Sequence, residues 1–188
     1  LVERVRQAES HVRTDDKLTR AVALAYFRLL SYKDEYEVAR LHTGSDFIKS
    51  VRTDYGKTAR LRFHLAPPFL SGKRDARGRP LKKSFGAWVI PVFKLLAGMR
   101  KLRGTAFDVF GYTAERRMER QLIAEFEALV DELLTRADPA ALEALQDCAA
   151  LYMEVRGYGP VKEAAANKVR QQVAERRISV RRCADEKG

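Results

Sequence analysis

The sequence predicts a mainly α-helical domain with one inserted β-hairpin. Apolar residues recur every three or four positions in several long segments, as in helices that bury one face. Between these segments, residues 58–66 switch to alternating apolar and polar residues, which is the two-residue period of a strand. A lone hairpin is marginally stable in water, so we expect it to pack on the helices or on another domain.

The first predicted helix covers residues 14–42, where the apolar residues share one face. Thr14 or Asp15 can cap its start, because either side-chain oxygen can accept a hydrogen bond from a free N–H of the first turn. Gly44 is a typical stop signal. A shorter helix is expected over residues 45–51.

The predicted hairpin has its strands at about 58–66 and 81–88. Pro67 and Pro68 end the first strand, because proline lacks the N–H that a strand ladder needs. Residues 71–80 have the composition of a loop, with two glycines. We therefore expect a hairpin with a long tip.

Four further helices are predicted from their apolar faces, over residues 89–102, 114–136, 139–154 and 161–177. Thr113 is the expected cap of the second of these helices, and Asp138 caps the third, with Pro139 in its first turn. We expect a single helical domain over 1–178, followed by a charged, disordered tail over 179–188. The chain begins with Leu1 and a polar run, which indicates a segment of a longer protein.

Composition excludes several classes of protein. The two cysteines are too few for a disulfide framework, an iron–sulfur carrier or a four-thiolate zinc site, and Cys148 is expected to be a buried structural thiol. The longest stretch without charged residues, 84–93, is half the length needed to span a bilayer. We therefore expect a cytoplasmic protein that does not enter the membrane.

The net charge of +11 is distributed unevenly along the chain. Residues 44–104 carry 15 basic and 3 acidic residues, whereas residues 105–155 carry 4 basic and 11 acidic ones. Two interpretations follow. Either the acidic segment neutralises the basic one within the chain, or the basic segment docks an anion: nucleic acid, a phosphorylated cofactor or an acidic protein.

Several charged residues are candidates for contacts with an anion or a partner. Arginine suits two-pronged contacts with carboxylates and phosphates, and a lysine in a first helical turn after a glycine-rich turn can hold a phosphate. The candidate anion or partner contacts are Arg103, Arg116, Arg117, Arg120, Arg156 and Lys162. Internal ion pairs with nearby glutamates are the competing interpretation for the arginines that follow Thr113.

A second group of residues is a candidate for contacts with another domain. The polar run that begins at residue 32 offers carboxylates that can anchor basic groups of another segment, although a solvated helical face explains the same run. His64 lies in a predicted strand, where a structural hydrogen bond is expected rather than metal binding. These candidate inter-domain contacts are Lys33, Asp34, Glu35 and His64. No catalytic residue and no metal ligand is predicted.

Four phrases of the sequence together resemble a known family. They are YKDEYEVARLH at 32–42, FHLAPPFL at 63–70, LRGTAFDVFGYTAERRMERQLI at 102–123 and VRGYGPVKE at 155–163. They resemble the C-terminal domain of the fused indolepyruvate:ferredoxin oxidoreductases, members of the 2-oxoacid:ferredoxin oxidoreductase group, over about residues 18–165. Pro160 departs from the pattern, because many relatives have His there.

The resemblance implies a parent enzyme that oxidatively decarboxylates an aryl-pyruvate to an acyl-CoA and passes the electrons to ferredoxin. Thiamine diphosphate, Mg²⁺ and iron–sulfur clusters are then expected in other segments of a homo-oligomeric enzyme. The present segment lacks the cluster cysteines and the Gly-Asp-Gly signature of a thiamine diphosphate site. It is therefore expected to be inactive alone.

Three roles are open for such a segment. It is a scaffold that packs on the catalytic domains, a basic surface that attracts acidic ferredoxin, or a contact for the phosphates of CoA. A different class, a basic helical module that binds nucleic acid, is suggested by the basic residues around Trp88 and Phe85. No recognised nucleic-acid-binding motif accompanies them.

Overall fold

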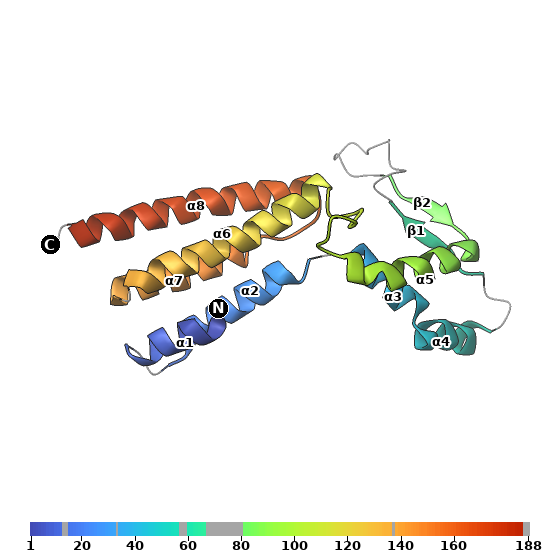
Figure 1. Ribbon diagram of the computed structural model, residues 1–188, viewed down its shortest axis with the longest axis horizontal. Helices are drawn as coiled ribbons and strands as arrows, with labels where there is room; N and C mark the ends of the chain where they lie inside the picture. The colour runs from blue at the N-terminus through green and yellow to red at the C-terminus, as the bar shows by residue number, and fades with distance from the viewer. Residues whose placement is uncertain (13–14, 33, 57–59, 67–80, 137, 186–188) are drawn as a thin grey trace. The chain divides into compact units, whose positions relative to one another are not determined.

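The computed structural model describes residues 1–12, 15–32, 34–56, 60–66, 81–136 and 138–185. Its described part is mainly helical, with one antiparallel two-stranded hairpin, which confirms the predicted fold class (Figure 1). Where one domain over 1–178 was predicted, the chain forms two compact units. Unit 1 comprises Leu1–Tyr32 and Arg117–Gly188, and unit 2 comprises Lys33–Arg116.

Unit 1 is a bundle of helices. Its elements are α1 (Val2–Ser10), α2 (Lys17–Leu30), α6 (Ala114–Arg136) from Arg117 onward, α7 (Pro139–Tyr152) and α8 (Pro160–Asp185). In Figure 1, α8 runs alongside α6 and α7. Side chains of all five helices meet in one core, and its fully buried members include Val5, Leu18, Val22, Leu122, Phe126, Leu142, Leu145 and Val169.

Phe126 lies at the centre of the unit 1 core. Its ring stacks on Tyr26 of α2 at 6.2 Å between ring centroids and meets Tyr152 of α7 edge to face at 4.9 Å. Such aromatic pairs stabilise a core beyond the area that they bury. The apolar face predicted for the helix at 114–136 thus joins α6 to α2 and α7.

A buried carboxylate joins α1 to α2. Glu9, at 1% exposure, accepts hydrogen bonds from the backbone N–H groups of Leu18 at 2.7 Å and Thr19 at 2.8 Å, and from Thr19 Oγ1 at 2.6 Å. It therefore supplies the acceptor that the start of α2 needs. Asp16 occupies the N-cap position, but its side chain makes no capping hydrogen bond. The prediction that Asp15 caps this helix is wrong, and Thr14 lies outside the described residues.

The prediction of one helix over 14–42 is also wrong. The chain leaves α2 after Leu30 and enters α3 (Glu35–Thr43) through Asp34, whose backbone is extended. Asp34 Oδ1 accepts a hydrogen bond from the N–H of Tyr36 at 3.0 Å. A side chain that caps a new helix in this way competes with helix continuation.

Unit 2 packs the hairpin against short helices. Its elements are α3, α4 (Ser45–Tyr55), β1 (Phe63–Leu65), β2 (Lys83–Phe85), η1 (Ala87–Val89), α5 (Ile90–Gly98) and η2 (Met99–Leu102). The strands pair in the register Phe63 with Phe85 and Leu65 with Lys83. The predicted hairpin is confirmed with shorter strands, and its predicted tip at 71–80 lies outside the described residues.

A small aromatic core holds the hairpin on α3 and α5. Phe63 meets Phe93 of α5 edge to face at 5.3 Å, and the ring of His42 from α3 lies 5.5 and 5.6 Å from these two rings. Ala39 and Val89 complete the buried cluster. The expectation that the hairpin packs on helices is therefore met within unit 2.

The C-terminal helices follow the predicted boundaries closely, with one exception. Asp138 Oδ1 caps α7 by accepting from the N–H of Ala141 at 2.8 Å, and Thr113 Oγ1 accepts from the N–H of Arg116 at 3.3 Å. Helix α8, however, continues to Asp185 instead of ending at residue 177. Residues 178–185 contain no glycine or proline, so no strong stop signal ends the helix earlier. Within the described ranges, no helix has the length and apolar character that a bilayer crossing requires.

We predict that Glu9→Ala lowers the free energy of unfolding of unit 1 by about 2 kcal/mol, because it leaves the first N–H groups of α2 without an acceptor. Urea unfolding followed by far-UV circular dichroism measures this change. Glu3→Ala is the matched control, because Glu3 is exposed and pairs only with Arg6 of its own helix among the described residues. Its expected effect is below about 0.5 kcal/mol. Equal effects of the two substitutions would contradict the capping role of Glu9.

Candidate functional site

Residues of two of the four phrases that carry the family resemblance, at 32–42 and 102–123, meet in unit 2 at the start of α3. Asp34 uses Oδ1 to cap α3 and Oδ2 to accept a hydrogen bond from Arg103 Nη1 at 3.0 Å. Glu35 accepts two hydrogen bonds from Arg116, from Nη2 at 2.9 Å and from Nε at 3.3 Å. The Arg116 side chain is only 7% exposed. A two-pronged pair with this degree of burial fixes the geometry of both partners.

Asp108 organises the loop between η2 and α6. It is 6% exposed, and it accepts hydrogen bonds from Tyr36 Oη at 3.1 Å, from the N–H of Gly104 at 3.0 Å and from the N–H of Gly111 at 3.1 Å. Tyr36 also packs edge to face on Phe110 at 5.2 Å. The loop is thereby tied to α3 by a carboxylate and an aromatic pair.

The protonation of this pair follows from its surroundings. Burial alone would raise the pKa of Asp108, but the hydrogen bonds from Gly104, Tyr36 and Gly111 hold this pKa below its ordinary value. Burial and the hydrogen bond to Asp108 raise the pKa of Tyr36 to about 12. At neutral pH, Tyr36 is therefore a neutral donor to an ionised Asp108, which is a structural arrangement.

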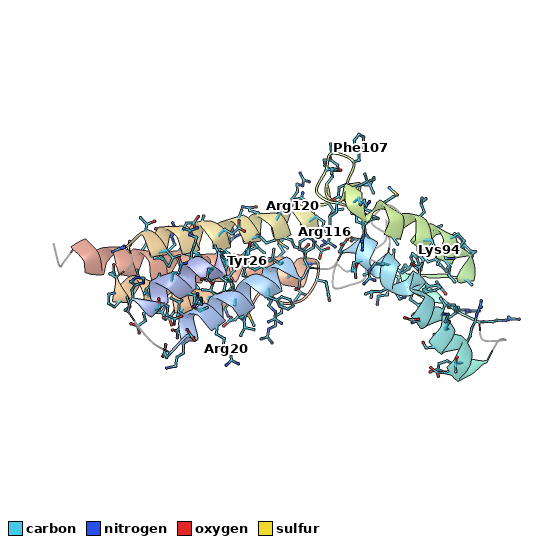
Figure 2. All side chains as sticks on the ribbon, turned by 60° about the horizontal axis from the view of Figure 1, so that its bottom comes forward. Arg20, Tyr26, Lys94, Phe107, Arg116 and Arg120 are labelled. Atoms are coloured by element: carbon cyan, nitrogen blue, oxygen red, sulfur yellow. The ribbon has the colours of Figure 1, made fainter. Side chains whose placement is uncertain are left out.

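Glycine is required at position 111 because the carboxylate of Asp108 lies against it. A Cβ added to Gly111 would lie 2.8 Å from Asp108 Oδ2 and 3.2 Å from the carbonyl oxygen of Asp108. Phe107, by contrast, projects from the same loop and is 74% exposed (Figure 2). The loop therefore has a tightly fitted inner side and an apolar outer tip.

In unit 1, acidic residues of α6 pair with basic residues of α8. Lys162 Nζ lies 2.6 Å from Glu119 Oε1, and the two side chains are 14% and 2% exposed. Further along the same two helices, Arg170 pairs with Glu125 at 2.8 Å, and Arg177 pairs with Glu132. These three acidic residues of 105–155 are thus paired with cations of the C-terminal helix.

Three of the residues predicted to contact an anion are paired with carboxylates of the chain. Arg103 and Arg116 are engaged by Asp34 and Glu35 in unit 2, and Lys162 is engaged by Glu119 in unit 1. Arg116 and Arg120 lie in the first turns of α6 (Figure 2).

The remaining candidates lie on the surface. Arg117 and Arg120 are exposed on α6, and Arg156 is exposed with its Nε donating to the carbonyl oxygen of Met153 at 3.1 Å. His64 is exposed on β1 opposite Ser84. Lys33 lies outside the described residues.

Each unit contains a cavity among its described residues. The first, of about 410 Å³, lies in unit 2 and is lined by residues of α4, of the segment 60–62 and of the turn that leads into α5. The second, of about 330 Å³, lies between α6, α7 and α8 in unit 1 beside Tyr152, Arg170 and Arg177. The sequence analysis missed both cavities. The alternation of Arg60 and Arg62 was the available signal for the first one.

The chemistry of the described residues is not that of a metal or thiol centre. No three residues among the described His, Cys, Asp and Glu lie where they could hold a metal ion. Cys148 is fully buried in the unit 1 core, as expected, and burial raises the pKa of its thiol to about 11. Such a thiol is inert at neutral pH.

A model of one protein family, described as "Family of unknown function (DUF6537)", matches residues 1–175. Neither the curated proteins nor the solved structures contain a match to this chain. The family match covers both compact units.

We predict that Asp108→Asn destabilises unit 2 by about 2 kcal/mol at neutral pH. An asparagine accepts hydrogen bonds with one atom only, so its NH₂ group would face the N–H of Gly104 or Gly111. Urea unfolding followed by the fluorescence of Trp88, the only tryptophan of the chain, reports on this unit.

The same variant has a defined pH dependence. Because the folded pKa of Asp108 lies below its ordinary value of 3.8, the stability that this group contributes is complete above that value and is lost as the pH falls through the lowered pKa. The stability gap between wild type and Asp108→Asn therefore narrows on acidification to about pH 3. A gap that stays constant or widens would contradict the assignment.

Gly111→Ala is expected to destabilise unit 2 by more than about 1 kcal/mol, because its Cβ collides with the Asp108 carboxylate. The matched control is Gly98→Ala at the end of α5, where an added Cβ meets nothing within 4 Å. That control is expected to be neutral or slightly stabilising, as alanine favours helix. Equal losses for both variants, again by Trp88 fluorescence, would show that Asp108 does not constrain position 111.

For unit 1, Lys162→Met is expected to cost about 3 kcal/mol, because it leaves the Glu119 carboxylate buried without its cation. Urea unfolding by far-UV circular dichroism measures this cost. The control Arg156→Met removes an exposed cation from the preceding turn and is expected to cost less than about 0.5 kcal/mol. Adding Glu119→Gln to Lys162→Met should recover part of the loss. A Lys162→Met variant as stable as the control would refute a structural role for the pair.

Proposed function

We propose that this chain, which belongs to the DUF6537 family of unknown function, is a non-catalytic accessory domain of a larger indolepyruvate:ferredoxin oxidoreductase. Its role there is to pack against the catalytic domains and to present a basic surface. The parent enzyme oxidatively decarboxylates an aryl-pyruvate, so that CO₂ leaves, the acyl group passes to CoA and ferredoxin takes up the electrons. The reaction is inferred from the resemblance of the four sequence phrases to that family. The arrangement of charges supports the accessory role.

The observation that carries the accessory role is that the best-placed cations are engaged by carboxylates of the chain itself. Arg116 is buried in a two-pronged pair with Glu35, and Lys162 is buried against Glu119. A cation that neutralises an internal carboxylate is not available to a phosphate of CoA unless that carboxylate is left unpaired, which is costly. This favours the scaffold over the CoA contact.

The resembling phrases also contact one another. The phrase at 32–42 meets the phrase at 102–123 through Asp34, Glu35 and Tyr36, and the phrase at 155–163 meets the latter through Lys162. The charged residues of these phrases thus form the hydrogen bonds and ion pairs that connect the elements within each unit. Within each unit, these contacts support an arrangement of the elements that exists before a partner binds.

The described residues do not fit the cofactors of the parent reaction. An iron–sulfur cluster needs several accessible thiolates, whereas Cys148 is fully buried with a raised pKa and only one other cysteine exists in the sequence. The proposal therefore assigns thiamine diphosphate, Mg²⁺ and the clusters to other segments of the enzyme. No chemical step is assigned to this chain.

A second candidate function is the binding of nucleic acid. One observation favours it: unit 2 carries 18 basic and 8 acidic residues and exposes aromatic rings, among them Trp88 at 66% and Tyr55 at 73%. Exposed aromatics among cations are typical of surfaces that bind single strands. The sequence resemblance gives this candidate no support.

The proposed function is tested with the full-length protein that carries this chain. We expect aryl-pyruvate- and CoA-dependent reduction of methyl viologen by the full-length protein, and no such activity in the 188-residue chain alone. A full-length protein that oxidises no 2-oxo acid would overturn the proposal.

The scaffold and the CoA contact are separated by kinetics of the same enzyme. Arg103→Ala is expected to leave the KM for CoA unchanged within about twofold, because Arg103 pairs with Asp34 inside unit 2. Lys94→Ala, which removes an exposed cation of α5 outside the candidate contacts, is the matched control. A KM for CoA that rises about tenfold or more in Arg103→Ala alone would assign that residue to CoA and contradict the scaffold.

A further inference from the structure

The cavity of about 410 Å³ in unit 2 is an open groove with an aliphatic floor. Its apolar lining consists of Ile48 and Val51 from α4, Leu61 from the segment before β1, and Ile90 at the start of α5. Its volume of about 410 Å³ is sufficient for one or two large side chains. The described lining contains no carboxylate.

The same groove is bordered by three arginines. Arg52, Arg60 and Arg62 all line it and are all exposed. Within the described part of the chain, no carboxylate pairs with any of the three. They differ in this from Arg103 and Arg116 of the same unit, which are held by internal carboxylates.

The distribution of charge indicates an anionic occupant larger than a small molecule. Unit 2 has 18 basic against 8 acidic residues, whereas unit 1 has 18 against 17. Almost the entire net charge of the chain therefore lies in the unit that contains the groove. An excess of this size attracts an extended partner of opposite charge and raises its association rate.

The floor of the groove discriminates between classes of polyanion. Surfaces that bind single-stranded nucleic acid stack bases on aromatic rings, but the described residues that line the groove include none. Ile48, Val51, Leu61 and Ile90 instead suit an aliphatic side chain, such as leucine, of a protein. An apolar anchor in a pocket with charges at its rim is the usual arrangement of a protein–protein hot spot.

From these observations we propose that the groove between α4, residues 60–62 and the start of α5 docks an acidic protein segment that inserts an aliphatic side chain. Arg52, Arg60 and Arg62 bind the carboxylates that flank this anchor. The inference does not rest on the oxidoreductase role, since it uses only the groove and the charge of unit 2.

The test uses the purified 188-residue chain and short fluorescein-labelled peptides, with binding measured by fluorescence anisotropy at physiological salt. The probe has central leucines flanked by glutamates, and its matched partner has serines in place of the leucines. Oligothymidylate is the third probe. We expect the leucine peptide to bind at least about tenfold more tightly than the serine peptide and the oligothymidylate.

Two variants change the groove in different ways, one by filling it and one by reversing its charge. Ala87→Trp places a large side chain at an exposed lining position and leaves every charge in place. The double variant Arg60→Glu, Arg62→Glu reverses the rim. Each variant is expected to bind the leucine peptide about tenfold more weakly than the wild type does. The charge-matched control is Lys94→Glu, Lys101→Glu, which changes exposed residues of unit 2 outside the lining and is expected to weaken binding less than about threefold.

The proposal is overturned by any of four results. These are equal binding of the leucine and serine peptides, tighter binding of oligothymidylate, equal weakening by the control and the rim variant, and the absence of binding by any probe. Far-UV circular dichroism of each variant establishes that the fold is intact. Because every probe is tested on the isolated chain, failure here leaves the viologen assay of the full-length protein as a separate test of the oxidoreductase role.

Discussion

Both units of this chain depend on carboxylates that have left water and must be met by donors. Glu9 ties α1 to the start of α2, Glu119 binds Lys162 of α8 from α6, and Asp108 ties the η2–α6 loop to α3. A buried carboxylate without a donor at any of these positions would lower the stability of the fold, so the positions of the donors are constrained as strongly as those of the carboxylates. The positions of the helices follow from these joints as much as from the apolar cores.

The need to pair carboxylates with cations affects the two units differently. Unit 1 is almost neutral, and pairs such as Arg170 with Glu125 consume its cations. Unit 2 keeps an excess of ten positive charges after its own pairs are made within the unit. The folding of the chain therefore uses most charges in one unit and leaves a basic surface in the other. This basic surface is the one on which we propose that an acidic partner docks.

Much of the fold was predictable, because helix periodicity and caps are local. The faces of α6 and α7 and the capping by Thr113 and Asp138 could be read from neighbouring residues. The break at Asp34 was missed, because its polar run also suits a solvated helix face. Helix α1 was not predicted, and the capping of α2 by Glu9 was missed because the acceptor lies nine residues before its partner Leu18. Residues of three separate segments line the groove of unit 2, so no single stretch of the sequence predicts it.

The central claim is that the cations of the resembling phrases hold this chain together and do not bind a substrate. Calorimetric titration of the purified chain with CoA, at low and then at physiological salt, tests it most directly. The account predicts no saturable heat at physiological salt, because Arg116 and Lys162 are engaged by Glu35 and Glu119. Saturable micromolar binding that survives physiological salt and disappears in Arg103→Ala would contradict it and make this a substrate-handling domain.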